Sequence, residues 1–246
     1  YHNYGEVVNT ANAKSPLDPN YPGVFFALGL LDVDKVAYVS SNIADTTFTL
    51  EPFTYMGLPN DHTYGTDPGK PTPQSMVADN DEATGRLIDA LSHSPYWASS
   101  AVIVLEDDPS DGGDHVEMHR SPCLLISPWA KSGYVSSVHY DNPSVWKTIT
   151  LLLGVGSMNL YDENAAAMYD AFSPTPNLEP YTFIPRKVPA ATNSADAPMA
   201  AESASIDWSH PDSAPLGRIL WKSVHGKDAE PPWGTAKIPR GGDGDD

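Results

Sequence analysis

The sequence has little cysteine and few basic residues. Its 246 residues include a single cysteine, Cys123, which excludes an intramolecular disulfide and a zinc site built from several cysteines. Cys123 opens the apolar run Cys-Leu-Leu-Ile, so we expect its thiol to be a small buried hydrophobic group. With 14 Lys and Arg against 32 Asp and Glu, the formal net charge is −18. This charge disfavours binding to a nucleic-acid backbone or to an anionic membrane surface.

Long hydrophobic runs are also absent. No stretch approaches the about 18 consecutive apolar residues that a transmembrane helix needs. The N-terminal residues Tyr-His-Asn-Tyr resemble no signal peptide, and they include no initiating Met. Two interpretations stay open: a processed or trimmed chain, or a missing upstream segment. The sequence contains no Gly-x-Ser-x-Gly, P-loop or Gly-x-Gly-x-x-Gly motif, which argues against α/β-hydrolases and the common nucleotide-binding folds.

Apolar periodicity predicts a helix over residues 75–92. Its apolar face comprises Met76, Ala83, Leu87, Ile88 and Leu91. We expect the opposite face, with Asp79, Asp81, Glu82 and Arg86, to contact water. Near the N-terminus, residues 24–31 form a candidate buried segment, and residues 35–40 and 46–50 are candidate strands.

Two short apolar runs follow this helix. Residues 101–105 and 123–127 each predict a buried strand, and a polar loop rich in Gly and His separates them. A further helix is expected from Asn142 to a C-cap at Gly154. Helix, strand, loop, strand and helix in this order predict an α/β sheet covered on both faces. Functional sites of such sheets gather where loops leave the carboxyl ends of the strands.

The composition changes near residue 185. We expect a domain over 1–185, followed by a Pro-, Ala- and Asp-rich linker, a short helix and an acidic tail over 186–246. The helix of the tail is expected at residues 216–224, where an amphipathic pattern would let it dock on the domain.

Two clusters of acids and histidines are candidate metal sites. The first is Asn60-Asp61-His62-Thr63, and the second combines Glu106-Asp107-Asp108 with Asp114, His115 and His119. Carboxylates and imidazoles together suit zinc, manganese or iron, whereas carboxylates alone suit calcium. An Asp-His pair in a loop is often only a helix cap or a surface feature. Three adjacent acids after a strand need a compensating cation, basic partner or solvent, which favours a metal role.

The spacing of the two histidines in the second cluster excludes one type of zinc site. His115 and His119 are four residues apart, but Gly112 and Gly113 place His115 in a loop rather than within a helix. The pair therefore does not form a helical His-Glu-x-x-His motif, and Glu117 is not the base of such a site.

Several long motifs, in order, resemble the phosphoesterase branch of the alkaline phosphatase superfamily. The similarity covers residues 4–182 and is greatest to bacterial proteins that pair a β-propeller with an alkaline-phosphatase-like domain. It rests on Leu-Pro-Asn-Asp-His-Thr at 58–63, Met-Val-Ala-Asp-Asn-Asp at 76–81, Ser-His-Ser-Pro-Tyr-Trp at 92–97, the acid–histidine region 106–121, and Ile-Ser-Pro-Trp-Ala-Lys at 126–131.

The resemblance implies a three-layer α/β/α sandwich with a divalent metal site at the strand ends. It suggests Asp61 and His62, with His115 or His119, as ligands of one ion, and Asp107 and Asp108 as ligands of the other. The ion is zinc, manganese, iron or calcium. The implied activity is hydrolysis of a phosphomonoester or phosphodiester small molecule, in an extracellular or periplasmic protein.

One departure from the family separates two functional hypotheses. The superfamily's Ser or Thr nucleophile lies in an N-terminal half that this chain does not match, since only 59 residues precede Asn60. The chain thus resembles the C-terminal half of such an enzyme: a proteolytic piece, an incompletely determined sequence or a diverged member. A separate N-terminal half or a second copy is an expected partner. The alternative is a non-catalytic secreted structural or interaction protein with the same fold, which could bind calcium.

Overall fold

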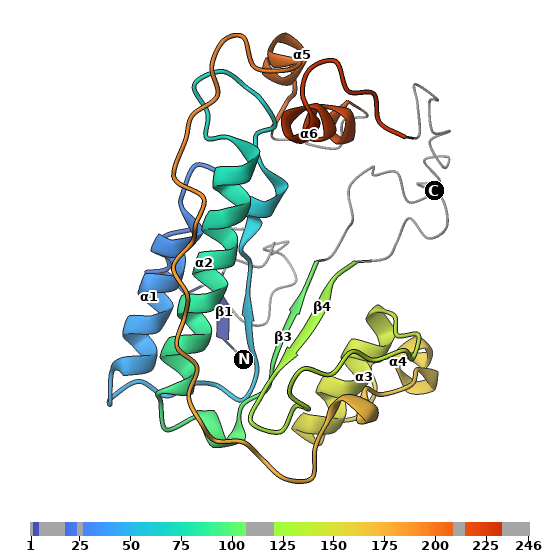
Figure 1. Cartoon of the computed structure of the whole chain (residues 1–246). Helices are drawn as coiled ribbons and strands as arrows, with labels where there is room; N and C mark the ends of the chain where they lie inside the picture. Colours follow the sequence, from blue (N-terminus) through green and yellow to red (C-terminus); the bar gives the residue numbers. More distant parts are fainter. Residues whose placement is uncertain (1, 5–17, 24–26, 107–120, 209–214, 233–246) are drawn as a thin grey trace. The chain divides into compact units, whose positions relative to one another are not determined.

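The computed structural model describes residues 2–4, 18–23, 27–106, 121–208 and 215–232. The chain divides into two compact units (Figure 1). The first contains Tyr1–Asn60, Asp79–Leu105 and Pro122–Arg186, and the second contains Asp61–Ala78, Glu106–Ser121 and Lys187–Asp246. The elements follow in the order β1 (His2–Tyr4), α1 (Asp32–Ala44), β2 (Thr54–Met56), η1 (Pro59–His62), α2 (Pro73–Ser92), η2 (Trp97–Ser99), β3 (Val102–Leu105), β4 (Cys123–Ile126), α3 (Asn142–Leu153), α4 (Leu160–Asn164), η3 (Tyr169–Ala171), α5 (Ala200–Ala204) and α6 (Leu216–His225).

Helix α1 replaces the strand expected at residues 35–40. Its buried residues are Asp32, Lys35, Val36, Val39 and Ile43. These positions recur at intervals of three and four, which is the helical period, whereas a strand would alternate every second residue. The expected strand at 46–50 is also wrong, because residues 46–47 form a turn and residues 48–50 have no regular secondary structure. Of the candidate buried segment at 24–31, residues 24–26 lie outside the described residues, and Leu28 is buried whereas Leu30 and Leu31 are exposed.

Helix α2 confirms the helix expected at 75–92 and its apolar face, on which Met76, Ala83, Ile88 and Leu91 are buried. The expected solvent-facing side is partly wrong. Asp79 is 1% exposed and Glu82 is 8% exposed, whereas Asp81 contacts solvent. Polar partners from other segments of the first unit account for this burial, as described below.

The described strands form two small sheets. Strands β1 and β2 pair in parallel, with His2 opposite Thr54, and β3 and β4 pair antiparallel, with Val102 opposite Ile126. Helices and small sheets of this kind are compatible with an α/β fold. The strands expected at 101–105 and 123–127 are present, but their predicted burial is wrong. Leu105 and Cys123, which pair with each other, are both exposed.

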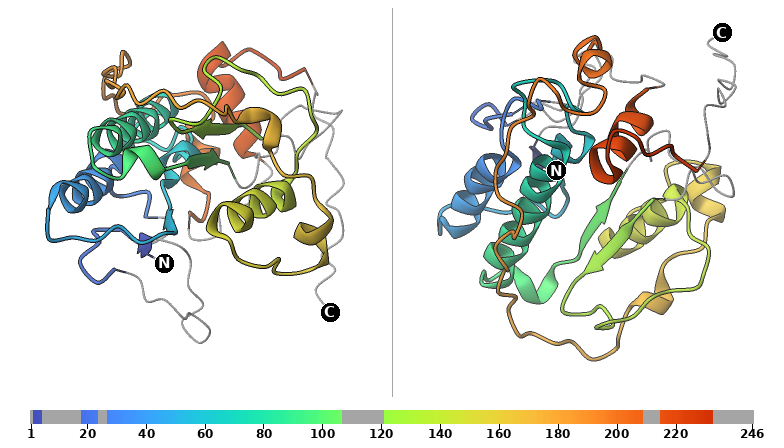
Figure 2. Two further views of the ribbon diagram at one scale, coloured as in Figure 1. Left: turned by 90° about the horizontal axis from the view of Figure 1, so that it is seen from below. Right: turned by 45° about the horizontal axis from the view of Figure 1, so that its top comes forward.

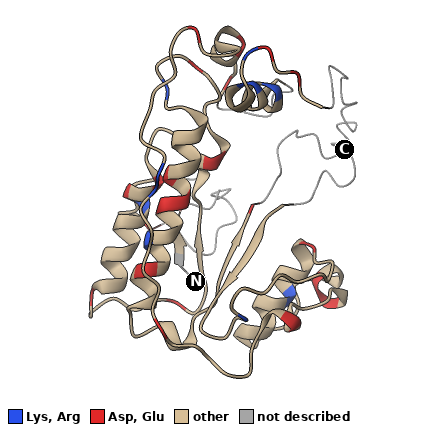
Figure 3. Ribbon diagram, in the orientation of Figure 1, with Lys and Arg blue, Asp and Glu red and all other residues tan. Residues whose placement is uncertain are grey.

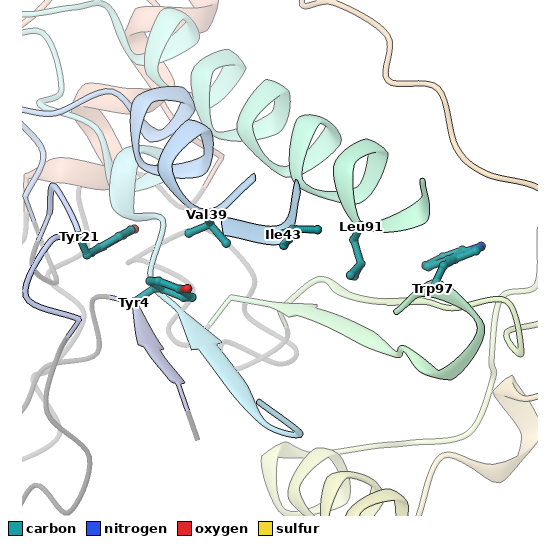
Figure 4. Close-up of a cluster of buried hydrophobic side chains, with 6 residues drawn as sticks. All are labelled: Tyr4, Tyr21, Val39, Ile43, Leu91 and Trp97. Carbon is teal, nitrogen blue, oxygen red and sulfur yellow. The ribbon is translucent and has the colours of Figure 1, made fainter. Parts of the chain in front are cut away.

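A cluster of buried side chains joins the helices to both sheets in the first unit. It comprises Tyr4, Tyr21, Val39, Ile43, Leu91 and Trp97 (Figure 4). The Tyr4 and Tyr21 rings are tilted and 5.4 Å apart between centroids, a favourable arrangement for aromatic pairs. Partly buried Met56 of β2 and Val102 of β3 pack against the same cluster. The core therefore lies between helices α1 and α2 and one face of each sheet.

An extended segment over residues 173–186 runs alongside α2 within the first unit (Figures 1 and 2). Tyr181 donates its backbone N–H to Ser92 Oγ at 2.9 Å, and its ring meets Trp97 edge-on at 5.8 Å. Further along, Phe183 packs under Arg86, whose guanidinium carbon is 5.4 Å from the ring centroid. This segment brings Arg186 to the acidic residues of α2.

Helix α3 confirms both of its predicted ends. Its start carries a capping box, in which Asp141 accepts a hydrogen bond from the backbone N–H of Ser144 at 2.9 Å. It ends at Gly154, which adopts a left-handed conformation with φ of 66°. Beyond this cap the large apolar side chains are exposed, among them Val155, Met158 and Leu160.

The second unit is held by buried polar side chains. Asn193 donates its side-chain amide to the carbonyl oxygens of Gly65, Asp67 and Pro71. Helix α6 confirms the helix expected at 216–224 and buries Leu216 and Ile219. In the part of the chain that the structure describes, no helix is both long enough and apolar enough to cross a membrane.

Candidate functional site

The short helix η1 carries the first predicted ligand pair. Asn60 is buried, Asp61 is exposed and His62 is half-buried, so three successive residues have three different environments. The other predicted ligands, Asp107, Asp108, His115 and His119, lie outside the described residues. The described chain reaches Glu106, directly after β3, so the structure supports the predicted start of this acidic loop at the end of a strand.

Two buried carboxylates hold Asn60 in the first unit. Its backbone N–H donates to Asp32 Oδ2 at 3.0 Å, and its side-chain amide donates to Asp79 Oδ2 at 2.8 Å. The same amide also reaches the carbonyl oxygen of Leu30 at 3.2 Å. Asn80 donates to Asp32 Oδ2 at 3.1 Å and to the Leu58 carbonyl at 2.7 Å, so the residues on both sides of Pro59 are fixed. We call Asp32, Asn60, Asp79 and Asn80 the buried polar network.

Two cations compensate the charge of this network. Lys35 Nζ lies 2.8 Å from Asp32 Oδ1, and both side chains are at most 1% exposed. Burial nevertheless raises the pKa of Asp32, because the loss of hydration outweighs the opposing effect of Lys35. Arg186 lies 3.8 Å from Asp79 Oδ1, an oxygen without a hydrogen-bond partner among the described residues, and 3.2 Å from Glu82. Figure 3 shows acids along α2 with Lys and Arg nearby.

Two residues of the second unit lie beside the half-buried His62 ring. Its Nδ1 lies 3.2 Å from the carbonyl oxygen of Thr63, and Trp208 meets the ring edge-on at 6.2 Å. Trp208 also meets Tyr64 edge-on, with 5.5 Å between the centroids. A histidine that donates Nδ1–H to a carbonyl carries its lone pair on Nε2, which is the usual arrangement of a metal-binding imidazole.

Thr63 has a backbone conformation that is rare for its residue type. Its φ is 66°, although the side chain is β-branched and the residue is 1% exposed. Its hydroxyl accepts a hydrogen bond from the backbone N–H of Gly65 at 2.9 Å. The chain thus turns sharply, in a strained conformation, directly after His62.

The donor chemistry at η1 fits part of a divalent metal site. Asp61 offers carboxylate oxygens, and His62 offers an imidazole whose Nδ1 lies beside a carbonyl oxygen. Among the described residues no group of three or more His, Cys, Asp or Glu side chains could hold a metal ion by itself. A complete site therefore needs further ligands, and Asp107, Asp108, His115 and His119 stay predictions.

The sequence patterns did not predict the burial of Asp32 and Asp79 beside Asn60, or the positive φ of Thr63. A signal for Asp79 existed, because it lies three residues after Met76 and four before Ala83, on the apolar face of α2. Asp32 begins the buried stripe of α1 in the same way. For Thr63 the sequence carries no signal, since positive φ values are typical of Gly and Asn rather than Thr.

Comparison with known proteins relates the chain to phosphoesterases. Residues 70–156 match the Phosphoesterase family. This region contains all of α2 and α3, both strands of the β3–β4 pair and four predicted ligands, from Asp107 to His119. The chain is also similar to a non-hemolytic phospholipase C of Pseudomonas aeruginosa, with 26% identity over an alignment of 166 positions that covers 49% of this chain and 23% of that protein. The alignment thus reaches less than a quarter of the relative's length.

Proposed function

We propose that the protein hydrolyses phosphoesters with the help of bound divalent metal ions. The observation that carries this proposal is the match of residues 70–156 to the Phosphoesterase family, which includes the predicted acidic loop. The similarity to a phospholipase C supports a phosphoester as the substrate class. The helix η1 adds a carboxylate and an imidazole in adjacent positions.

In this proposal the chain supplies ligands from two segments. Asp61 and His62, with His115 or His119, hold one ion, and Asp107 and Asp108 hold the other. Bound ions of this type stabilise negative charge on the phosphoryl oxygens and on the leaving group. A proton on Nδ1 of His62, donated to the Thr63 carbonyl 3.2 Å away, would leave the lone pair of Nε2 for a metal ion. A Ser or Thr hydroxyl outside the motifs named above would act as the nucleophile.

The fold and location belong to the same proposal. An alkaline-phosphatase-like three-layer α/β/α sandwich would place both ligand segments at the ends of strands. Helix η1 begins three residues after the end of β2, and Glu106 directly follows β3, which agrees with this placement along the chain. The family resemblance also favours an extracellular or periplasmic protein, and zinc, manganese, iron or calcium as the ion.

Binding of the reaction product tests the proposal without requiring the nucleophile. We expect the chain loaded with Zn²⁺ or Mn²⁺ to bind inorganic phosphate in a calorimetric titration. The metal-free chain and the variant Asp107→Ala should bind none, because the ions provide the positive charge. Release of p-nitrophenolate from p-nitrophenyl phosphate and from its diester analogue would then measure turnover. Phosphate binding that is equal with and without metal, or absent in both, would contradict the proposal.

A further inference from the structure

We propose that Asn60 and Thr63 are positioning residues that hold the Asp61–His62 pair in the geometry of metal ligands, Asn60 through its hydrogen bonds in the buried polar network and Thr63 through the turn that follows His62. This inference rests on the proposed function and deepens it. Asn60 precedes the pair and Thr63 follows it, so the four residues are consecutive in the chain. Both flanking residues are 1% exposed, whereas Asp61 is exposed and His62 is half-buried.

The anchor before the pair is built from two separate helices. Asn60 contacts Asp32, the first residue of α1, and Asp79 in α2, through its backbone and its side chain respectively. These acceptors are themselves linked, because the backbone N–H of Asp32 donates to Asp79 Oδ2 at 2.6 Å. Charged, buried acceptors make strong hydrogen bonds, so the position of Asn60 is closely fixed relative to both helices. A surface turn that only connects two elements needs no such support.

The anchor after the pair is a strained backbone. Thr63 is one of two described non-glycine residues with positive φ. Such conformations persist only where the surrounding structure determines them, and they concentrate at functional sites. Here the hydroxyl of Thr63 bonds the N–H of Gly65, which is itself left-handed with φ of 55°. Glycine in place of Thr63 would relieve the strain, so Thr63→Gly tests whether the rigid turn matters for His62.

The role of Thr63 can be separated from a general contribution to folding. Thr63→Gly removes the strain and leaves the turn free to reorient, so the melting temperature should stay the same or rise. Thr63→Asn tolerates the left-handed conformation, and its side chain can accept the same N–H two residues later. If the turn positions His62, Thr63→Gly should weaken metal binding while Thr63→Asn preserves it.

Asn60 provides a second, independent pair of variants. Asn60→Ala removes the donor to Asp79 and to the Leu30 carbonyl. Asp79→Asn keeps an oxygen that can accept the same hydrogen bonds, so it should preserve the geometry of η1 while it loses the charge that faces Arg186. Asp170→Asn serves as a matched control, because Asp170 accepts hydrogen bonds from the hydroxyl groups of Tyr134, Ser136 and Tyr140, none of which belongs to the buried polar network.

The experiment measures Zn²⁺ affinity by competition with a chromogenic chelator and thermal unfolding of the metal-free chain. We expect Asn60→Ala and Thr63→Gly to raise the Zn²⁺ dissociation constant about tenfold or more, as loss of groups that orient a ligand does. Thr63→Asn, Asp79→Asn and Asp170→Asn should stay close to the wild type. Unchanged Zn²⁺ affinity in Asn60→Ala and Thr63→Gly would overturn the inference. A loss of Zn²⁺ affinity that is proportional to the fall in melting temperature in every variant would also overturn it.

A second readout separates failure of this inference from failure of the proposed function. The carbon-bound imidazole protons of His62, assigned by comparison with His62→Gln, report its environment by NMR without metal. If the wild type binds no Zn²⁺, the metal proposal fails, and the inference is judged on this signal alone. The inference then requires the His62 signal to shift or broaden in Thr63→Gly and to have its wild-type position and width in Thr63→Asn. A signal that is the same in all variants overturns it.

Discussion

The backbone N–H of Asp32 donates a 2.6 Å hydrogen bond to Asp79 Oδ2, which joins the start of α1 to the middle of α2. Asp32 is the first residue of a 13-residue helix, so the Asp79 carboxylate lies at the positive end of the α1 dipole. The side chains of Asp32 and Asp79, each at most 1% exposed, thus lie close to each other. The charge can be retained there because Lys35 and Arg186 lie close to it.

Removal of Lys35 should reveal the cost of this burial. Lys35→Met keeps most of the buried stem but leaves the Asp32 carboxylate without its cation. Loss of one partner of a buried ion pair destabilises a protein by about 3–5 kcal/mol, and we expect a loss of that size in the free energy of unfolding. Chemical denaturation of the two proteins measures it.

The double variant Lys35→Met with Asp32→Asn is the control for this prediction. It removes both charges and keeps an oxygen that can accept from the backbone N–H of Asn60. We expect it to be more stable than Lys35→Met alone. A double variant that is equally or less stable would show that packing, rather than charge, explains the effect.

Asp170 should contribute to the acid sensitivity of the first unit. Hydrogen bonds from Ser136, Tyr140 and Tyr134 lower the pKa of Asp170 from 3.8 to about 2. The folded chain then binds the proton less tightly than the unfolded chain does. The contribution of Asp170 to stability is therefore complete above pH 3.8 and is lost as the pH falls towards 2.

The variant Asp170→Asn lacks this titrating group. We expect the difference in unfolding free energy between wild type and variant to be constant above about pH 5 and to shrink as the pH falls below about 4. Denaturation curves for both proteins across this range provide the measurement. A difference that grows on acidification would contradict the assigned hydrogen bonds.

The left-handed C-cap of α3 makes Gly154 intolerant of a side chain. Gly154 has φ of 66° and an added Cβ would meet no atom within 4 Å, so strain alone determines the effect. Gly154→Ala should therefore lower stability by about 1–2 kcal/mol. Gly156, two residues later, is equally open but has no positive φ. We expect Gly156→Ala to leave thermal unfolding nearly unchanged, and equal losses in both variants would refute this explanation.

Asn193 should be a stability determinant of the second unit. Its amide donates to three carbonyl oxygens at 3.1–3.2 Å, and the residue is 8% exposed. Asn193→Ala leaves these buried acceptors unpaired, with an expected cost of about 1–3 kcal/mol in unfolding free energy. The neighbouring Ser194→Ala, which removes only an exposed bond to Asp196, should cost less than about 0.5 kcal/mol. Similar losses of stability in the two variants would argue against a stabilising role of the three Asn193 hydrogen bonds.

The sequence predicted elements whose signals are local. The apolar period of α2, the β3 and β4 runs and the Gly154 cap all depend on neighbouring residues, and each is present. The burial of Asp79 and the exposure of Cys123 depend on what packs against them from distant segments. The charge of Asp79 favoured a position in solvent, although Arg186 and Asn60 lie beside its buried carboxylate.

The candidate site was predictable in the same limited sense. Residue type and resemblance predict Asp61 and His62 as ligands, and this stays a prediction. The contacts of the neighbouring Asn60 with α1 and α2 were not predictable, since they join residues 28 and 19 positions apart. The strained turn at Thr63 was also beyond prediction, because it contradicts the usual preference of Thr for negative φ.

The central claim, that acids and histidines of this chain bind divalent metal ions, is tested most directly by metal content. We would measure zinc, manganese, iron and calcium by inductively coupled plasma mass spectrometry in freshly purified, unchelated protein. The account predicts one or two equivalents of a divalent ion per chain, lost in Asp107→Ala and retained in Asp170→Asn. A wild-type chain without bound metal, or one whose metal content is unchanged in Asp107→Ala, would contradict it.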